Sequence, residues 1–189
     1  MLMLFNKKIK FSVSEAIIKE DFYADDKTAV LRVNLRFPQI TCPKTDPLFK
    51  TAAPFYKNLA DSFYGYCKES LLPVALKAYK ESQEQFNPYS AVMQWENTFL
   101  SEKHLSVLQK ISVSDGNTPP VTAVKTQVWE RQKGTKCSVW DFISKTNINE
   151  LLAKYPHLNK KILGLQLFTL WENGVTVYDL KGNCTKINL

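Results

Sequence analysis

The chain has 189 residues, of which 44% are apolar and 23% are charged, a composition typical of one folded domain. Its formal net charge is +7, but basic and acidic residues are interspersed and only three arginines occur. Because arginine supplies most fork-like contacts to phosphates and bases, this pattern makes nucleic acid the weakest candidate partner.

The termini and the cysteines restrict the location and the chemistry. The opening MLMLFNKKIK does not have the order of a secretory signal, and no apolar run is long enough to span a membrane. The chain as written is therefore predicted to be cytoplasmic. The four cysteines form no C-x-x-C pair, which argues against a zinc ribbon or a redox dithiol. Their state stays open between four thiols and two disulfides: Cys42, Cys67, Cys137 and Cys184.

The first third of the chain predicts a hairpin followed by a helix. Apolar residues alternate over 7–14 and again over 28–40, with an acidic turn between them, so these two segments are expected to pair. Residues 54–82 carry an apolar and aromatic stripe at helical spacing, suited to covering a sheet. Pro73 is expected to kink or break this helix, because proline cannot donate to the helical ladder.

The middle of the chain predicts more strands. Residues 91–116 are rich in β-formers around a polar turn, and a hairpin with strands 121–130 and 136–141 surrounds the loop RQKGT. Alternation places Trp129 opposite the face that carries Val128. The same alternation over 136–141 places Trp140 beside Ser138 and Phe142.

The last part of the chain predicts a short helix and another hairpin. Asn147 and Glu150 form a capping-box pattern at the start of the segment TNINELLAKYP. Asn173-Gly174 joins two apolar strands, and residues 165–171 are apolar on both faces, which is typical of a central strand. The prediction is one α+β domain over residues 1–189: a mixed, mostly antiparallel sheet covered by a long kinked helix, with a second short helix.

No pattern of catalytic or metal-binding residues is visible. The two histidines, His104 and His157, are far apart and neither has a carboxylate or cysteine at ligand spacing. Neither a nucleophile elbow nor a glycine-rich phosphate loop occurs. We therefore predict no catalytic residue, no metal and no cofactor.

The remaining candidate is an aromatic and basic surface on the hairpin around RQKGT. Such side chains suit binding to a protein or a glycan. A tryptophan in a strand is more often packed than functional, so at least one of the two is expected in the core. The predicted binding residues are Trp129, Arg131, Lys133, Lys136 and Trp140.

Four segments resemble the extracellular domain of RsiV-type anti-sigma factors, which also precedes the catalytic part of the PdaC peptidoglycan deacetylase. LRVNLRFPQI is similar to a family strand that ends in a Pro-Gln/Lys-Ile motif, and the helix of 54–82 follows where the family has its long helix. VWERQKGTKCSVWDFI resembles the family hairpin, and LQLFTLWENGVTVYDL resembles its closing hairpin. The resemblance covers residues 28–182.

The resemblance implies a non-catalytic module that binds a protein or glycan. The partner stays unknown at this point, with lysozyme-like proteins and cell-wall ligands as the candidates that the family suggests. Two features depart from the family. The segment ISVSDGNTPPVTAV lacks the family's tyrosine- and glycine-rich stretch ending near a histidine, and no anchor or deacetylase part is present in the chain. Family members are often extracytoplasmic. A cell-wall-associated hydrolase or accessory enzyme is the alternative function, and weak nucleic-acid binding is the third.

Overall fold

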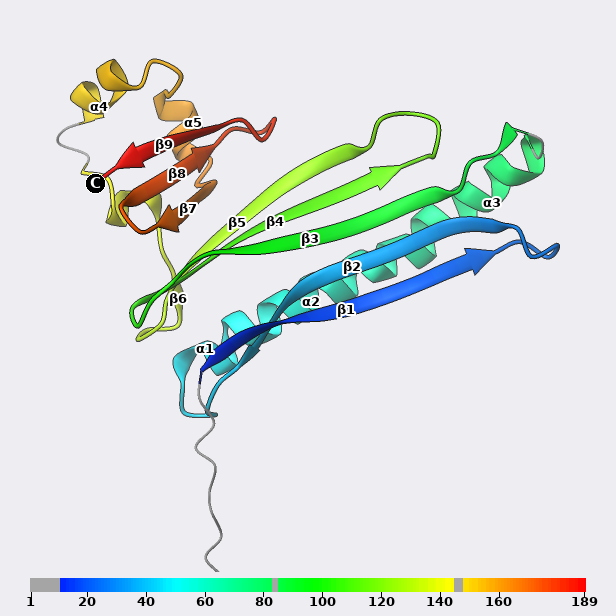
Figure 1. The fold of residues 1–189 in the computed structure, drawn as a ribbon, viewed down its shortest axis with the longest axis horizontal. Coiled ribbons are helices and arrows are strands. Elements are labelled where there is room, and N and C mark those ends of the chain that lie inside the picture. Colours follow the sequence, from blue (N-terminus) through cyan, green and yellow to red (C-terminus); the bar gives the residue numbers. More distant parts are fainter. Residues whose placement is uncertain (1–10, 83–84, 145–147) are drawn as a thin grey trace, which may run out of the picture.

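The computed structural model describes residues 11–82, 85–144 and 148–189 of the chain. Its larger layer is a six-stranded sheet in which neighbours along the chain are neighbours in space (Figure 1). All pairs are antiparallel except β2 with β3, which are parallel, so the predicted mixed sheet is confirmed. The strands are β1 (Ser12–Tyr23), β2 (Ala29–Thr41), β3 (Tyr89–Leu100), β4 (His104–Ser114), β5 (Val121–Glu130) and β6 (Thr135–Lys136).

The predicted first hairpin is present, and its first strand extends further along the chain than expected. Residues 7–10 of the predicted strand 7–14 lie outside the described residues, and β1 continues to Tyr23. The acidic run after Ile18 still alternates, with Phe22 packed on the core, and so it pairs with β2 rather than turning. The turn itself is short and is closed by the carboxylate of Asp26, which accepts from the backbone N–H of Thr28 at 3.0 Å.

One long bent helix lies along the sheet, as predicted (Figure 1). Its parts are α2 (Ala52–Tyr66), a π-helical turn (Cys67–Leu71) and α3 (Leu72–Glu81), and the short α1 (Pro47–Lys50) precedes it. Pro73 is the second residue of α3, and the wider π turn just before it accommodates the hydrogen bond that proline cannot donate. The predicted kink is therefore an interruption just before Pro73 and not a break into separate helices.

The helix buries the apolar face of the strands beneath it. Leu31, Val33 and Leu35 of β2 are fully buried against Ala60 and its neighbours on the helix. Small side chains on the buried stripe of the helix bring it close to the sheet. Fully burying a leucine contributes roughly 2 kcal/mol, so this layer supplies much of the folding free energy.

A second part of the core lies under the start of the helix. The indole N–H of Trp129 donates to the hydroxyl of Tyr56 at 2.8 Å, and Trp129 is only 4% exposed. Phe55 packs edge-on against both rings, with centroids 5.2 Å and 5.6 Å away. The prediction that at least one hairpin tryptophan belongs to the core is confirmed.

A smaller three-stranded sheet packs on the other face of the large one (Figure 1). Its strands are β7 (Phe168–Trp171), β8 (Gly174–Tyr178) and β9 (Cys184–Asn188), and the short helices α4 (Ile148–Lys154) and α5 (Lys160–Gly164) accompany it. The predicted Asn173-Gly174 turn joins β7 to β8. The predicted N-cap Asn147 lies outside the described residues.

The prediction that 165–171 is a central strand is wrong. The strand begins only at Phe168, and the central strand of the small sheet is β8. Strand β7 is apolar on both faces because its free edge turns toward the large sheet. There the backbone N–H groups of Phe168 and Leu170 donate to the hydroxyls of Thr126 (2.8 Å) and Ser106 (2.9 Å). Hydroxyl groups of the large sheet thus accept hydrogen bonds from the backbone N–H groups at the free edge of the small sheet.

All four cysteines are free thiols, and Cys42 and Cys67 are buried. Within the described ranges, no helix is both long enough and apolar enough to cross a membrane.

Tyr56→Phe is expected to lower the free energy of unfolding by about 1–3 kcal/mol, because it leaves the Trp129 N–H buried without an acceptor. Urea unfolding followed by tryptophan fluorescence measures this. The matched control is Tyr66→Phe on the same helix. Tyr66 is 45% exposed, so this change is expected to alter the free energy of unfolding by no more than about 0.5 kcal/mol. Equal effects of the two changes would contradict the role of the buried hydrogen bond.

Candidate functional site

The hairpin of the large sheet has one long and one very short strand. Strand β5 turns through a loop that ends at Gly134, and β6 covers only Thr135–Lys136. Gly134 has φ of +67°, and a Cβ there would come within 2.9 Å of the backbone of Pro47. A glycine is therefore needed both for the turn and for the close approach of α1 to the loop.

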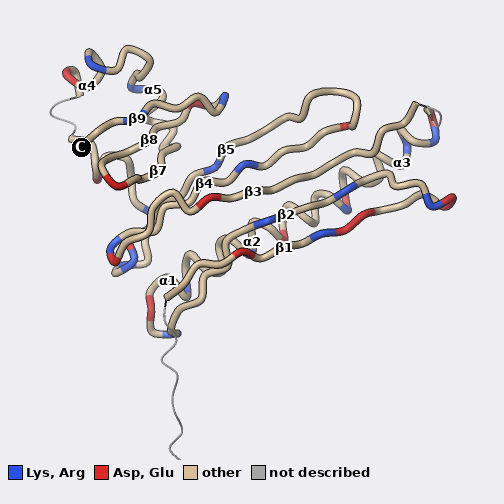
Figure 2. The backbone as a smooth tube through the Cα atoms, viewed as in Figure 1, with Lys and Arg blue, Asp and Glu red and all other residues tan. Residues whose placement is uncertain are grey.

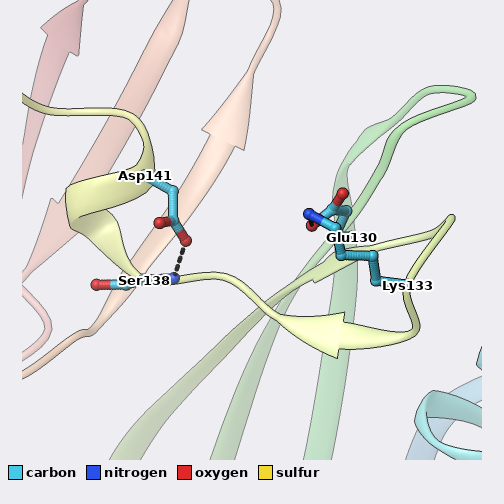
Figure 3. Close-up of polar contacts among 4 residues, drawn as sticks. All are labelled: Glu130, Lys133, Ser138 and Asp141. Atoms are coloured by element: carbon cyan, nitrogen blue, oxygen red, sulfur yellow. Dashed lines mark hydrogen bonds and ion pairs between the residues drawn. The ribbon is translucent and has the colours of Figure 1, made fainter.

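The prediction of a strand over 136–141 is wrong beyond Lys136. A 3₁₀ turn over Val139–Asp141 follows instead, opened by a capping box. The carboxylate of Asp141 accepts from the backbone N–H of Ser138 at 2.7 Å (Figure 3). The Ser138 hydroxyl accepts from the N–H of Trp140 at 3.3 Å. Local capping thus overrides the alternation of the sequence.

Two of the five predicted binding residues come together at the base of the hairpin. The ammonium of Lys136 lies 3.9 Å from the centroid of the Phe55 ring and 5.3 Å from that of Trp129. This is a cation–π arrangement on a buried aromatic cluster. The Trp129 ring thus lies beneath the Lys136 ammonium and is itself buried in the core.

The other three predicted residues lie apart from this pair. The guanidinium of Arg131 stacks 3.8 Å from the Phe11 ring centroid and donates to the carbonyl of Ser101 at 2.7 Å. Lys133 forms an ion pair with Glu130 at 3.0 Å in the loop (Figure 3). Trp140 is half-buried against the core of the small sheet. The five residues therefore do not form one continuous aromatic ledge.

A cleft of about 540 Å³ opens beside the hairpin, and Lys136 is the predicted residue that lines it. One wall comes from β5, a second from the residues that follow β6, and a third from the segment between α5 and β7. The lining residues that matter chemically are Thr126, Gln127, Lys136, Cys137, Gln166 and Leu167.

Gln166 fixes the third wall, and sequence reasoning did not single it out. Its side-chain oxygen accepts from the Ser138 hydroxyl at 2.8 Å and from the Val139 N–H at 3.0 Å, while its amide nitrogen donates to Leu163. Its backbone has φ of +56°, a left-handed conformation held by these bonds. The available signal was one polar residue inside the apolar run LGLQLFTL.

The ionisable groups of the cleft are one cation and one neutral thiol. Burial lowers the pKa of the Lys136 ammonium, and the nearby charge of Lys125 lowers it further. Burial raises the pKa of the Cys137 thiol to about 11, with further contributions from Asp141 and Glu130. A thiol with this pKa is protonated near neutral pH and is a poor nucleophile.

The edge of β5 next to the cleft has no strand beside it over Val121–Gln127 in the part of the chain that the structure describes. The Cys137 N–H donates to the carbonyl of Val128 at 2.7 Å on this side, and the Arg131 N–H donates to Lys103 on the opposite, β4 side. Because backbone groups alternate along an antiparallel strand, those of Thr122, Val124 and Thr126 face the open edge.

The histidines stand in other places. His104 packs its ring against Phe142, and burial lowers its pKa. His157 lines a separate cleft of about 380 Å³ with Asp179 and Cys184. The carboxylate of Asp179 accepts from Asn183 and Lys181 in a turn, and no hydrogen bond to His157 is formed within the described ranges. Those ranges also contain no group of three or more side chains placed to hold a metal ion.

Alkylation of the four thiols is expected to differ strongly at pH 7.5. Exposed Cys184 should react with iodoacetamide within minutes, while Cys137, whose pKa is raised to about 11, should react at least about 10-fold more slowly. Its rate should rise with pH up to about 11, because only the thiolate attacks. Peptide mapping by mass spectrometry measures each site, and comparable rates at Cys137 and Cys184 would contradict the neutral thiol.

Comparison with known proteins agrees with the resemblance found in the sequence. The sequence matches no protein-family model and no curated protein. A DUF3298-family protein from Bacteroides fragilis matches the structure with a TM-score of 0.64 at 12% identity, over 96% of this chain and 91% of that one. A DUF3298 protein from Pseudomonas aeruginosa aligns over 95% and 88% of the two chains at 12% identity, with a TM-score of 0.42. DUF3298 is the RsiV-like domain family, and the chain has the fold of its Bacteroides member.

Proposed function

We propose that this chain is a non-catalytic domain that binds a protein or other ligand in the cleft beside the β5–β6 hairpin. The observation that carries the proposal is Lys136, which lines that cleft and whose ammonium has no acidic partner among the residues described. That ammonium lies over two aromatic rings. A cation held in this way is available to a negatively charged group of a ligand.

The rest of the cleft suits recognition. Gln127 also lines the cleft, and its buried side-chain oxygen is an unused acceptor within the described ranges. Leu165 and Leu167, which are half-buried, add apolar surface on the facing wall. The capping box and the Gln166 bonds hold these walls in place, which is the pre-formed arrangement typical of binding sites.

The chemistry of the cleft favours binding over catalysis. Cys137 is its one thiol, and burial keeps that thiol protonated. The alternative, a cell-wall-associated hydrolase, would best use the separate cleft of His157 and Cys184. There the nearby Asp179 carboxylate is already engaged by Asn183 and does not orient the histidine.

Nucleic-acid binding has less support. Figure 2 shows lysine and arginine residues interspersed with aspartate and glutamate along strands and loops. Binding to a phosphate backbone needs a contiguous basic face. A lysozyme-like protein or a cell-wall fragment, which the RsiV resemblance implies, therefore comes first among the ligands to test.

The proposal predicts which amide resonances move on binding. ¹⁵N-labelled protein would be titrated with lysozyme, with soluble peptidoglycan fragments and with a mixed pool of short peptides. We expect at least one probe to shift resonances of Lys136–Ser138 and Gln166–Phe168. Lys136→Gln should lower the affinity for that probe about 10-fold, which is the effect of losing one charge-assisted contact.

The matched control is Lys133→Gln in the same hairpin, whose ammonium is already paired with Glu130 and should not matter. Mass spectrometry of the recovered probes adds the second readout. Chemical conversion of a probe in proportion to the amount of protein would contradict the non-catalytic assignment. Resonance shifts that avoid the cleft with every probe would contradict its location.

A further inference from the structure

We infer that the open edge of β5 over Val121–Thr126 is the docking site for an extended, acidic peptide segment of a partner protein, which adds to the sheet as a further strand. The inference rests on the proposed function and names the class of ligand that the cleft serves. It follows from the backbone, the two hollows at the ends of the edge, and the charges beside it.

The backbone of the edge is prepared for pairing. The N–H and C=O groups of Thr122, Val124 and Thr126 face away from β4, and no strand of the described chain takes them up. The edge is continuous with β6 pairing at its far end, where Trp129 and Lys136 are partners. Strand β6 pairs only with Trp129 and Glu130, so an extended peptide could pair with the rest of this edge, from Val121 to Thr126.

The near end of the edge offers an apolar groove. A hollow of about 480 Å³ lies on the helix side of the sheet, between the end of α2 and the outer ends of β4 and β5. Val121 is 79% exposed there and Tyr66 is 45% exposed. Its apolar and aromatic lining residues are Tyr66, Tyr89, Ile111, Val113, Val121 and Ala123, and the polar residues Ser114, Asp115 and Thr118 complete the lining.

The far end of the edge offers positive charge. Lys125 lies on the same face of β5 as Val121 and Ala123, two residues further along the strand, and it influences the pKa of Lys136. Neither ammonium pairs with a carboxylate within the described ranges. Because Lys136 pairs with Trp129, it lies on the same face of the sheet as Lys125, and the two lysines add uncompensated positive charge along this face. An acidic side chain of the added strand would lie beside Lys125.

The same features argue against a second copy of this chain as the occupant. Pairing two β5 edges would bring the Lys125 and Lys136 of each copy together, on a protein whose net charge is already +7. Pro119 and Pro120 also stand directly before the strand, which limits how far a pairing can extend. A lysine on an open edge deters indiscriminate pairing and selects a partner of opposite charge.

These placements define what the peptide must look like. On its helix-facing side an apolar residue lies beside Ala123, and an acidic residue lies two positions away, beside Lys125. The neighbour of the acidic residue on the side of Thr126 reaches the cleft lined by Thr126 and Gln127. The spacing of two holds for either strand direction, because side chains alternate in both.

The first experiment selects ligands from a phage-displayed library of random ten-residue peptides against the full chain. We expect enrichment of peptides with an acidic residue two positions from an apolar one. One such peptide is then synthesised with N-methyl groups on alternate amides. Methylating the set that donates to β5 should weaken binding at least about 10-fold, while methylating the other set should change it less than about 3-fold.

The second experiment exchanges charges across the new pair. Lys125→Glu should lower the affinity for the acidic peptide about 5-fold. Changing the acidic residue of the peptide to lysine should restore the affinity for this variant. The control is Lys110→Glu, an exposed lysine of β4 on the other face, paired with Val124, which should leave affinity unchanged. Circular dichroism confirms that both variants fold.

Each other result has a definite meaning. Equal loss from the two methylated sets, or no rescue by the charge exchange, would overturn strand addition. A dimer that the peptide dissociates would assign the edge to a second copy. If no peptide is enriched while lysozyme or peptidoglycan fragments still shift the cleft resonances, this inference fails and the proposed function stands. If none of these probes binds, both fail.

Discussion

The hydrogen bond between the Trp129 indole and the Tyr56 hydroxyl determines what the hairpin can offer to a ligand. It is buried and 2.8 Å long, and it joins the first turns of the long helix to the last residues of β5. Because it places Trp129 inside the core, the tryptophan cannot form an exposed aromatic ledge. What it leaves at the surface is a lysine, Lys136, held above the Trp129 and Phe55 rings.

Strand β5 contacts the long helix, the small sheet and β4, and these contacts leave one of its edges open. One face carries Trp129 under the helix. The other face carries Thr126, whose hydroxyl accepts the N–H of Phe168 from the small sheet. Side chains on both faces thus hold the layers together. Over Val121–Gln127 the backbone of β5 is bonded to β4 along one edge, and no strand of the described chain pairs with the other edge. The hairpin could have returned along that edge, but the capping box at Ser138 and Asp141 directs the chain toward the small sheet.

Local patterns predicted most of the fold, and tertiary contacts explain the failures. Alternation and helical spacing were enough for the first hairpin, the bent helix and the side of the sheet on which Trp129 lies. The same alternation failed at Trp140, where a capping box at Ser138 ends the strand; the serine-to-aspartate spacing was the signal available. The strand of 165–171 was misplaced because its burial comes from another sheet, through Ser106 and Thr126. Gln166 was missed because its role exists only once distant segments meet.

Amide hydrogen exchange along β5, with and without a bound peptide, tests the open edge most directly. In the free protein, the account predicts slow exchange at Ala123 and Lys125, whose N–H groups face β4, and fast exchange at Thr122 and Val124, whose N–H groups face outward. Bound peptide should slow amide exchange at Thr122 and Val124 and leave the exchange rates of Ala123 and Lys125 unchanged. Uniform protection of all four amides in the free protein, or no slowing on binding, would contradict the account.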